Sequence, residues 1–146
     1  MNVCRLPEEV SVKKLTGSCL CGKVVIEVPD AFDFMGFCHC SECRKASGSD
    51  YSIVGSVSSD KFCIIEGMEF IKFYHKSSET DVAFCRCCGS SLYNHKLKTR
   101  RYNIRLGILD TLPSQRPTFH IFVASKAPWD EISDGLPQYP AHPPQN

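Results

Sequence analysis

Short runs of β-branched and aromatic residues, separated by glycine, proline and polar clusters, dominate the hydrophobic pattern of the chain. Two such runs lie within residues 13–28 and meet at residues 19–22, and the second is rich in valine and isoleucine. β-Branched side chains are restricted in a helix and fit the pleated surface of a sheet. We therefore predict a β-hairpin whose turn carries two thiols.

Strand-like runs recur along the rest of the chain, after a break at Pro29-Asp30. An apolar run leads into a cysteine-rich polar turn that extends to Ser49, and later runs alternate with turn residues. The apolar run is residues 34–38, and the strands predicted beyond it are residues 51–57, 62–65, 68–74, 81–84, 91–93, 102–106 and 118–123. No apolar stripe of helical period supports a helical domain. The predicted fold class is all-β, with antiparallel sheets and little helix.

Length and composition indicate one globular domain. The chain of 146 residues suffices for a single core, which we place at about residues 13–136 of a domain spanning 1–146. Residues 137–146 hold four prolines and are predicted to form an irregular tail. Apolar residues make up 42% and charged residues 23% of the chain, which is typical of folded proteins.

Charge and hydropathy argue against nucleic-acid binding and against a membrane location. The formal charge of +1 gives no global preference for nucleic acid, and only residues 96–102 approach a basic, aromatic surface. No run approaches the roughly 18 apolar residues that a membrane span requires, and the first ten residues lack the apolar core of a signal peptide. We therefore expect a cytoplasmic protein without a membrane partner, and the sequence predicts no particular oligomeric state.

Seven of the ten cysteines fall into three clusters with metal-ligand spacing. In a reducing compartment thiols stay unpaired, so we expect metal binding rather than disulfides. A glycine after the second cysteine of a pair, as at Gly22 and Gly89, lets the backbone complete the turn around one ion. Zinc is the predicted metal, and an iron-sulfur cluster is the alternative. The clusters are CxC (Cys19, Cys21), CxCxxC (Cys38, Cys40, Cys43) and CxxC (Cys85, Cys88).

Seven sulfurs divide naturally into four and three. A closed structural zinc takes four thiolates, whereas a catalytic zinc has three protein ligands and one exchangeable position. The compact central cluster is the natural three-ligand set, so we predict two zinc ions per chain, one of them held by the two outer pairs. The spacing also permits Cys40 and Cys43 to join Cys85 and Cys88 instead.

The three remaining cysteines have simpler interpretations. Cys63 lies in a predicted strand and is interpreted as a core residue, and Cys4 as an unliganded residue of the N-terminal arm. Cys87 lies inside the last cluster. It is interpreted as a bystander, with ligand roles at either ion left open.

Polar residues around the central cluster are candidates for substrate binding. Seven thiolates and two divalent ions would change the formal charge from +1 to −2, so cations near the open ion should help an incoming thiolate to bind. Arg44 and Lys45 directly follow the last ligand, and Ser47 is a weaker candidate. His39 lies between two ligands, where it either orients a sulfur, relays a proton or is structural.

These motifs together resemble the family of glutathione-dependent formaldehyde-activating enzymes, the GFA or centromere-protein-V type of domain with the Mss4-like fold. The resemblance covers most of the chain, with Cys87 as a departure inside the CxxC motif. It rests on GSCLCGKV (17–24), CHCSECRKASG (38–48), FCRCCGS (84–90), HIFV (120–123), Trp129 and DGLP (134–137).

The resemblance implies roles for the ligands and a reaction. In this family the outer pairs hold a structural zinc, and the central triplet of Cys38, Cys40 and Cys43 holds a catalytic one. It implies a carbon-sulfur lyase that acts on glutathione adducts of small aldehydes, such as S-hydroxymethylglutathione. Two other functions stay open: a non-catalytic Mss4-like module that binds protein or nucleic acid, and a redox sensor that releases zinc.

Overall fold

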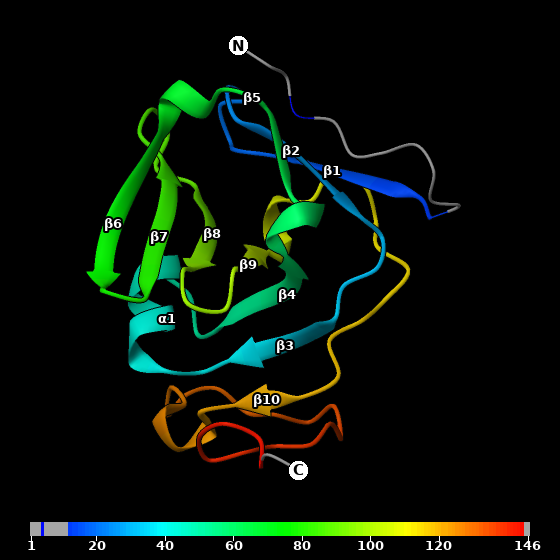
Figure 1. The fold of residues 1–146 in the computed structure, drawn as a ribbon. Helices are drawn as coiled ribbons and strands as arrows, with labels where there is room; N and C mark the ends of the chain where they lie inside the picture. The colour runs from blue at the N-terminus through cyan, green and yellow to red at the C-terminus, as the bar shows by residue number, and fades with distance from the viewer. Residues whose placement is uncertain (1–3, 5–11, 145–146) are drawn as a thin grey trace.

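Two β-sheets make up the protein in the computed structural model, which describes residue 4 and residues 12–144 (Figure 1). The smaller sheet has the order β1-β2-β5, and the larger has the order β10-β3-β4-β9-β8-β7-β6. The one α-helix of the described residues is α1, Ser41–Ser47. The all-β class is thus confirmed. The strands are β1 Lys14–Ser18, β2 Val25–Pro29, β3 Phe34–Cys38, β4 Ser52–Ser58, β5 Cys63–Glu66, β6 Ile71–Ser77, β7 Thr80–Cys85, β8 Ser91–Lys96, β9 Arg101–Arg105 and β10 His120–Ile121.

The predicted first hairpin is present as β1 and β2. Its antiparallel register pairs Gly17 with Ile26 and Ser18 with Val25, so the turn between the strands carries the first two thiols. Buried and half-buried positions alternate along both strands. Their buried side chains join those of the larger sheet in one core, in which the largest fully buried residues are Leu15, Val24, Ile26, Val28, Val57, Leu92, Tyr93 and Ile104.

Three local features differ from the sequence-based expectation. The predicted polar turn after Cys38 contains helix α1, which begins where the Cys40 sulfur accepts a hydrogen bond from the Cys43 amide at 3.2 Å. The helix ends at Gly48, whose φ of 62° is the left-handed conformation of a C-terminal cap. Residues 68–70, predicted as strand, form a 3-10 turn before β6, and β10 pairs with β3 in parallel.

The proline-rich tail follows β10 without forming a regular strand of its own. The amide of His120 donates to the Pro137 carbonyl at 2.8 Å, and the amide of Tyr139 donates back to the His120 carbonyl at 2.9 Å. The Phe122 amide donates to the Ala141 carbonyl at 3.1 Å. These bonds fix the described part of the tail beside the lower edge of the sheet in Figure 1.

One disulfide corrects the expectation that the cysteines outside the clusters are unpaired. Cys4 is bonded to Cys63, with their Cα atoms 5.4 Å apart. Cys63 is buried in β5 as predicted, but it is not a free thiol. The expectation rested on the redox state of a compartment, which carries no information about which two thiols the fold brings together.

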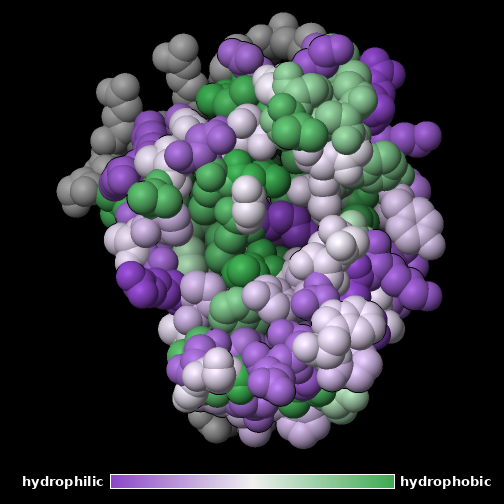
Figure 2. Space-filling view, turned by 180° about the vertical axis from the view of Figure 1, so that it is seen from behind, coloured by the Kyte–Doolittle hydropathy of each residue, from purple (hydrophilic) through white to green (hydrophobic). Residues whose placement is uncertain are grey.

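One face of the protein carries a depression. Figure 2 shows a face that is hollowed near its centre, where hydrophobic and hydrophilic side chains meet. Within the described residues, no helix is long and apolar enough to cross a bilayer.

Candidate metal centres and the adjoining cleft

Four sulfurs meet where the β1–β2 turn approaches the turn that follows β7. The Sγ atoms of Cys19, Cys21, Cys85 and Cys88 all lie within 4.8 Å of one another. Cys21 Sγ is 3.6 Å from Cys19 Sγ and 3.8 Å from Cys85 Sγ. A tetrahedral zinc with bonds of about 2.3 Å places its sulfurs roughly 3.8 Å apart, so this donor set fits zinc. The alternative in which Cys40 and Cys43 join the last pair is excluded by this arrangement.

Glycines and backbone amides shape the two turns around these sulfurs. Gly22 and Gly89 have φ values of 78° and 79°, which confirms the need for glycine after each second cysteine. The Val24 amide donates to Cys19 Sγ at 3.2 Å. Hydrogen bonds from the hydroxyl and backbone of Ser90 lower the pKa of Cys88 to about 5.

The three-sulfur group lies at the junction of β3 and α1. Cys38 ends β3, Cys40 caps the helix and Cys43 lies in its first turn, and their sulfurs are within 4.8 Å of one another. Among the described residues no fourth histidine, cysteine or carboxylate completes the group. Geometry thus leaves one side of a bound tetrahedral ion free of protein ligands.

The sulfurs of this triplet favour one negative charge and resist more. Hydrogen bonds from Cys38 and Cys43 lower the pKa of Cys40 to about 2. The same hydrogen bonding, seen from Cys38, raises its pKa, because a second thiolate would face the first, and burial adds to the rise. Three thiolates at this spacing therefore need a cation between them, which is the condition for a metal centre.

A cleft of about 840 Å³ adjoins the triplet. One side of it carries cations and amides, and the other carries aromatic and aliphatic side chains. The lining residues are Phe34, Gly36, Phe37, Cys38, Cys40, Ser41, Glu42, Cys43, Val54, Lys76, Asn94, Lys96, Asn103, Arg105, Phe119, Ile121, Phe122, Ser125, His142 and Pro143.

Arg105 is the buried cation of this cleft. The side chain belongs to a residue only 6% exposed, and its nitrogens donate to the neutral oxygens of Ser52, Ser91 and Asn94. Within the described part of the chain no carboxylate lies at ion-pair distance from it. The pKa of Cys43 is raised on balance, since Cys38 lowers it but Cys40 and burial raise it, and Arg105 opposes that rise. The negative charge that Arg105 faces is therefore that of the triplet.

Sequence reasoning missed the cations of the cleft, and of the polar residues that line it on β8 and β9 only Asn103 and Arg105 lie together in a predicted strand. Asn94 and Lys96 are two residues apart on β8, and Asn103 and Arg105 are two apart on β9, so each pair lies on one face of its strand. Asn94 pairs with Asn103 in the antiparallel register. Strands β8 and β9 therefore share a polar surface, which the sheet brings to the triplet. The predicted strand 91–93 ends before Asn94 and Lys96, so the sequence did not show this alternation on β8.

The residues predicted to bind substrate lie elsewhere around α1. Lys45 lines a separate cavity of about 490 Å³ beside Tyr74 and Phe84. The Ser47 hydroxyl donates to the Cys43 carbonyl at 2.7 Å, and the buried Nε of Arg44 has no hydrogen-bond partner among the described residues. None of the three lines the cleft beside the triplet, and their contact with substrate stays a prediction.

Cys87 lies outside both sulfur groups. It is exposed, and its sulfur is 3.8 Å from the Nζ of Lys23. This is the position expected of a bystander within the CRCC motif.

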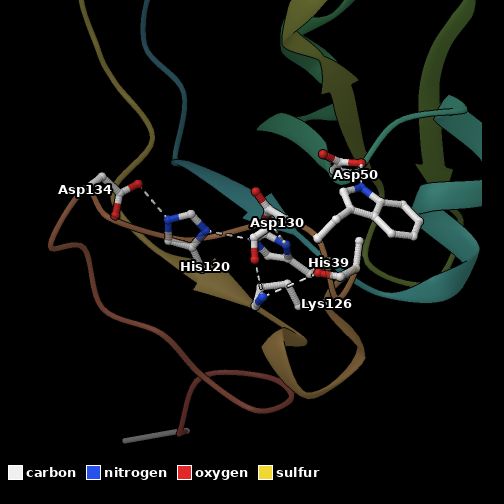
Figure 3. Close-up of polar contacts among 8 residues, drawn as sticks. His39, Asp50, His120, Lys126, Asp130 and Asp134 are labelled. Carbon is white, nitrogen blue, oxygen red and sulfur yellow. Dashed lines mark hydrogen bonds and ion pairs between the residues drawn. The ribbon is translucent and has the colours of Figure 1, made fainter.

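His39 lies in a chain of polar side chains with His120, Asp130 and Asp134, and the two imidazole rings are buried (Figure 3). Its Nε2 lies 2.8 Å from His120 Nδ1, and His120 Nε2 lies 2.7 Å from an oxygen of Asp134. On the other side of the ring, His39 Nδ1 is 3.7 Å from Asp130 Oδ2. The chain connects the loop between two sulfur ligands to the segment after β10.

The hydrogen bonds along this chain indicate which ring nitrogens of His39 and His120 carry a proton. The pKa of Asp134 is lowered by the Leu136 amide and by His120, so the carboxylate accepts from His120 Nε2–H. Burial lowers the pKa of His39, so that ring is neutral and donates from Nε2 to His120 Nδ1. In this assignment His39 Nδ1 carries no proton, and neither it nor Asp130 Oδ2 has a hydrogen-bond partner among the described residues.

An all-β fold with a four-sulfur and a three-sulfur group defines a protein with two potential thiolate metal centres. The model of the family described as glutathione-dependent formaldehyde-activating enzyme (GFA) matches residues 14–125. The chain belongs to the GFA family.

Two individual proteins are similar to it. A Talaromyces marneffei protein, whose name proposes a glutathione-dependent formaldehyde-activating enzyme, is 26% identical over an alignment of 113 residues, and the match covers 73% of this chain. The match spans 60% of that relative's length. A Rhodobacter sphaeroides protein of known crystal structure superposes with a TM-score of 0.58 at 22% identity, covering 85% of this chain and 98% of the other. The second likeness supports the fold.

Proposed function

We propose that the protein is a zinc-dependent carbon-sulfur lyase that acts on glutathione adducts of small aldehydes, such as S-hydroxymethylglutathione. The observation that carries this proposal is the three-sulfur group, which lacks a fourth ligand among the described residues and opens on a cationic cleft. Membership of the GFA family supports glutathione as the thiol.

Zinc is the proposed metal at both sulfur groups, two ions per chain. Cys19, Cys21, Cys85 and Cys88 would hold the structural ion, and the triplet Cys38, Cys40 and Cys43 the catalytic one. An ion held by three thiolates supplies one exchangeable position, at which a thiol loses its proton at neutral pH.

The cations of the cleft fit the charge of the substrate. Glutathione carries two carboxylates, and its reactive form adds the charge of a thiolate. Arg105, Lys96 and Lys76 line the cleft. Lys76 is paired with Glu42, and Lys96 Nζ donates to the Thr80 hydroxyl at 3.3 Å, whereas Arg105 has only neutral partners. Arg105 and Lys96 are therefore the side chains best placed to receive anionic groups of the substrate.

The reaction is redox-neutral in both directions. In adduct formation the glutathione sulfur attacks the carbonyl carbon, a carbon-sulfur bond forms, and the π electron pair moves to the oxygen. The proton released by the thiol balances the proton that this oxygen takes up. In the lyase direction the carbon-sulfur bond breaks and the hydroxyl proton is released as the aldehyde forms.

Exchange spectroscopy by NMR tests the proposal. With zinc-loaded protein, glutathione and formaldehyde, we expect faster interconversion of free and hydroxymethylated glutathione than in buffer. In Cys40→Ser the acceleration should fall roughly 100-fold or more, because the variant lacks one ligand of the zinc that stabilises the transition state. Cys87→Ser, the matched control outside the sulfur groups, should retain it. Equal rates in wild type and Cys40→Ser would remove the triplet from the reaction.

A further inference from the structure

We propose that the cleft selects thiol adducts of aldehydes with an apolar substituent of about the size of an aromatic ring, rather than the formaldehyde adduct alone. The inference rests on the proposed function and assigns the second substrate of the same site. It depends on an aromatic wall that faces the cleft, built from Phe34, Phe119, Ile121 and Phe122.

The wall begins at the sulfur group. Phe34, Gly36 and Cys38 alternate along β3, so they lie on one face of the strand. At about 3.4 Å per residue, Gly36 lies roughly 7 Å from Cys38 along the strand and Phe34 roughly 14 Å. A ring-sized substituent on a carbon bonded to a sulfur at the triplet therefore extends to the part of this surface beside Gly36, where the wall begins.

Gly36 makes room for one ring of the wall. A Cβ added at Gly36 would lie 2.5 Å from the Phe119 ring, so only glycine lets that ring rest against the backbone of β3. Phe34 continues the surface, with its ring centroid 6.1 Å from that of Phe119 and 40% of its surface exposed. The two rings thus form a continuous apolar surface that solvent and ligands can reach.

Phe122 reaches the cleft from a strained backbone. Its φ of 56° and ψ of 36° lie in the left-handed region, which bulky side chains rarely adopt. Its amide is bonded to the Ala141 carbonyl, and its ring stands edge-on to His142 at 4.8 Å. Strain of this kind persists where the surrounding structure enforces it, and it is concentrated at functional sites. Here it places an aromatic ring on the wall of the cleft.

The cations and the wall lie on the same face of the sheet, at opposite sides of the cleft. Gly36 on β3 pairs with Val54 on β4, which pairs with Arg105 on β9. Two strand spacings, roughly 10 Å, therefore separate the backbone at Gly36 from the backbone at Arg105. The charged ends of glutathione match the cations. Formaldehyde adds only one carbon and one hydroxyl, which leaves the aromatic wall without a substrate group to contact.

The size of the cleft agrees with a larger adduct. Its volume of about 840 Å³ lies within the range of roughly 300–1,000 Å³ typical of sites for drug-sized ligands. The addition step is unchanged: the carbon-sulfur bond forms, the carbonyl electron pair moves to oxygen, and the substituent takes no part in the electron flow.

Two measurements on the zinc-loaded full chain test the inference. The first compares enzymatic acceleration of glutathione exchange with phenylacetaldehyde and with formaldehyde, each relative to buffer; we expect at least tenfold greater acceleration with phenylacetaldehyde. The second is calorimetric binding of S-benzylglutathione and S-methylglutathione, in which the benzyl compound should bind at least tenfold more tightly. Phe34→Ala should reduce both preferences severalfold, and Leu112→Ala, at an exposed position outside the cleft, should not.

The outcomes separate the two proposals. Acceleration with formaldehyde but not with phenylacetaldehyde, together with equal affinity for the two thioethers, would overturn the inference and leave the lyase standing. No acceleration with either aldehyde would overturn the lyase and, with it, the substrate assigned here. Should Phe34→Ala fail to fold, Phe119→Ala serves as the second variant, and unchanged preferences in it would count against the wall.

Discussion

The two sulfur groups are both built from cysteines, but they differ in the number of sulfurs and in their position relative to the cleft. The four-sulfur group joins two hairpin turns that are 64 residues apart at Cys21 and Cys85, and none of its four cysteines lines the cleft. The three-sulfur group comes from one segment of six residues, at the end of a strand and the start of a helix, and it forms part of the cleft wall. The first arrangement closes the fold, and the second leaves a side open.

The surroundings of the two groups sharpen this difference. Backbone amides and the Ser90 hydroxyl supply the hydrogen bonds at the outer group. At the triplet a buried arginine, whose hydrogen-bond partners are neutral, offsets the thiolate charge. The buried His39, between two of the sulfur ligands, is hydrogen-bonded to His120. A metal centre that must accept a further anion needs such a cation, whereas a closed one does not.

The largest expected effect comes from breaking the outer group. Cys85→Ser removes one of four sulfurs that join the smaller sheet to the larger, so the free energy of unfolding should fall by several kcal/mol. Structural zinc contributes about 10–16 kcal/mol to the folding of zinc-finger peptides, which sets the upper scale. Denaturation followed by circular dichroism measures the loss.

Cys40→Ser is the matched comparison, because it also removes one sulfur. We expect it to lose one zinc ion per chain by elemental analysis while keeping a cooperative unfolding transition close to that of wild type. If the two variants lost equal stability, the division into a closed and an open group would be wrong.

A smaller effect is expected at the buried arginine. Arg105→Gln removes the cation but keeps a side chain that can donate to Ser91 and Asn94. Hydrogen bonds to charged groups contribute about 1.5–3 kcal/mol, so glutathione should bind roughly 10- to 100-fold more weakly. Titration of the zinc-loaded protein with glutathione measures this. Arg101→Gln, on the same face of β9 but outside the cleft, should bind normally; a similar loss in both would indicate a general charge effect.

Much of the fold was predictable because local chemistry determines it. The valine-rich run after Gly22 has no good helical alternative, and the turn that holds Cys19 and Cys21 needs the glycine that follows it. Helix α1 was missed because its sequence, SECRKAS, has no apolar stripe. The helix is stabilised at its two ends instead: a cysteine sulfur caps its first turn, and Gly48 ends its last turn.

The site was predictable only as far as neighbouring residues define it. Counting sulfurs predicted the groups of four and three, because each cluster is short and a metal imposes its coordination number. The place of Arg105 depends on the strand order β4-β9-β8, which no local pattern reveals. Arg44 and Lys45 were chosen because they adjoin the last ligand in sequence, yet a helix turns successive side chains in different directions.

The smallest expected effect concerns pH and should appear only on the side of the triplet. Burial lowers the pKa of His39 below its ordinary value of 6.5, so the unfolded chain binds a proton that the folded chain rejects. Its contribution to stability is complete above pH 6.5 and is lost as pH falls toward the lower folded pKa, by at most about 1.4 kcal/mol per pH unit. His39→Gln removes this titration, whereas zinc release at low pH affects wild type and variant alike. With saturating zinc, wild type should therefore lose more unfolding free energy than His39→Gln between pH 7.5 and 5.5.

His75→Gln, which removes an exposed imidazole, serves as the control for the loss of one histidine. Parallel pH curves for wild type and His39→Gln would show that the histidine chain does not carry the buried neutral ring inferred from its hydrogen bonds.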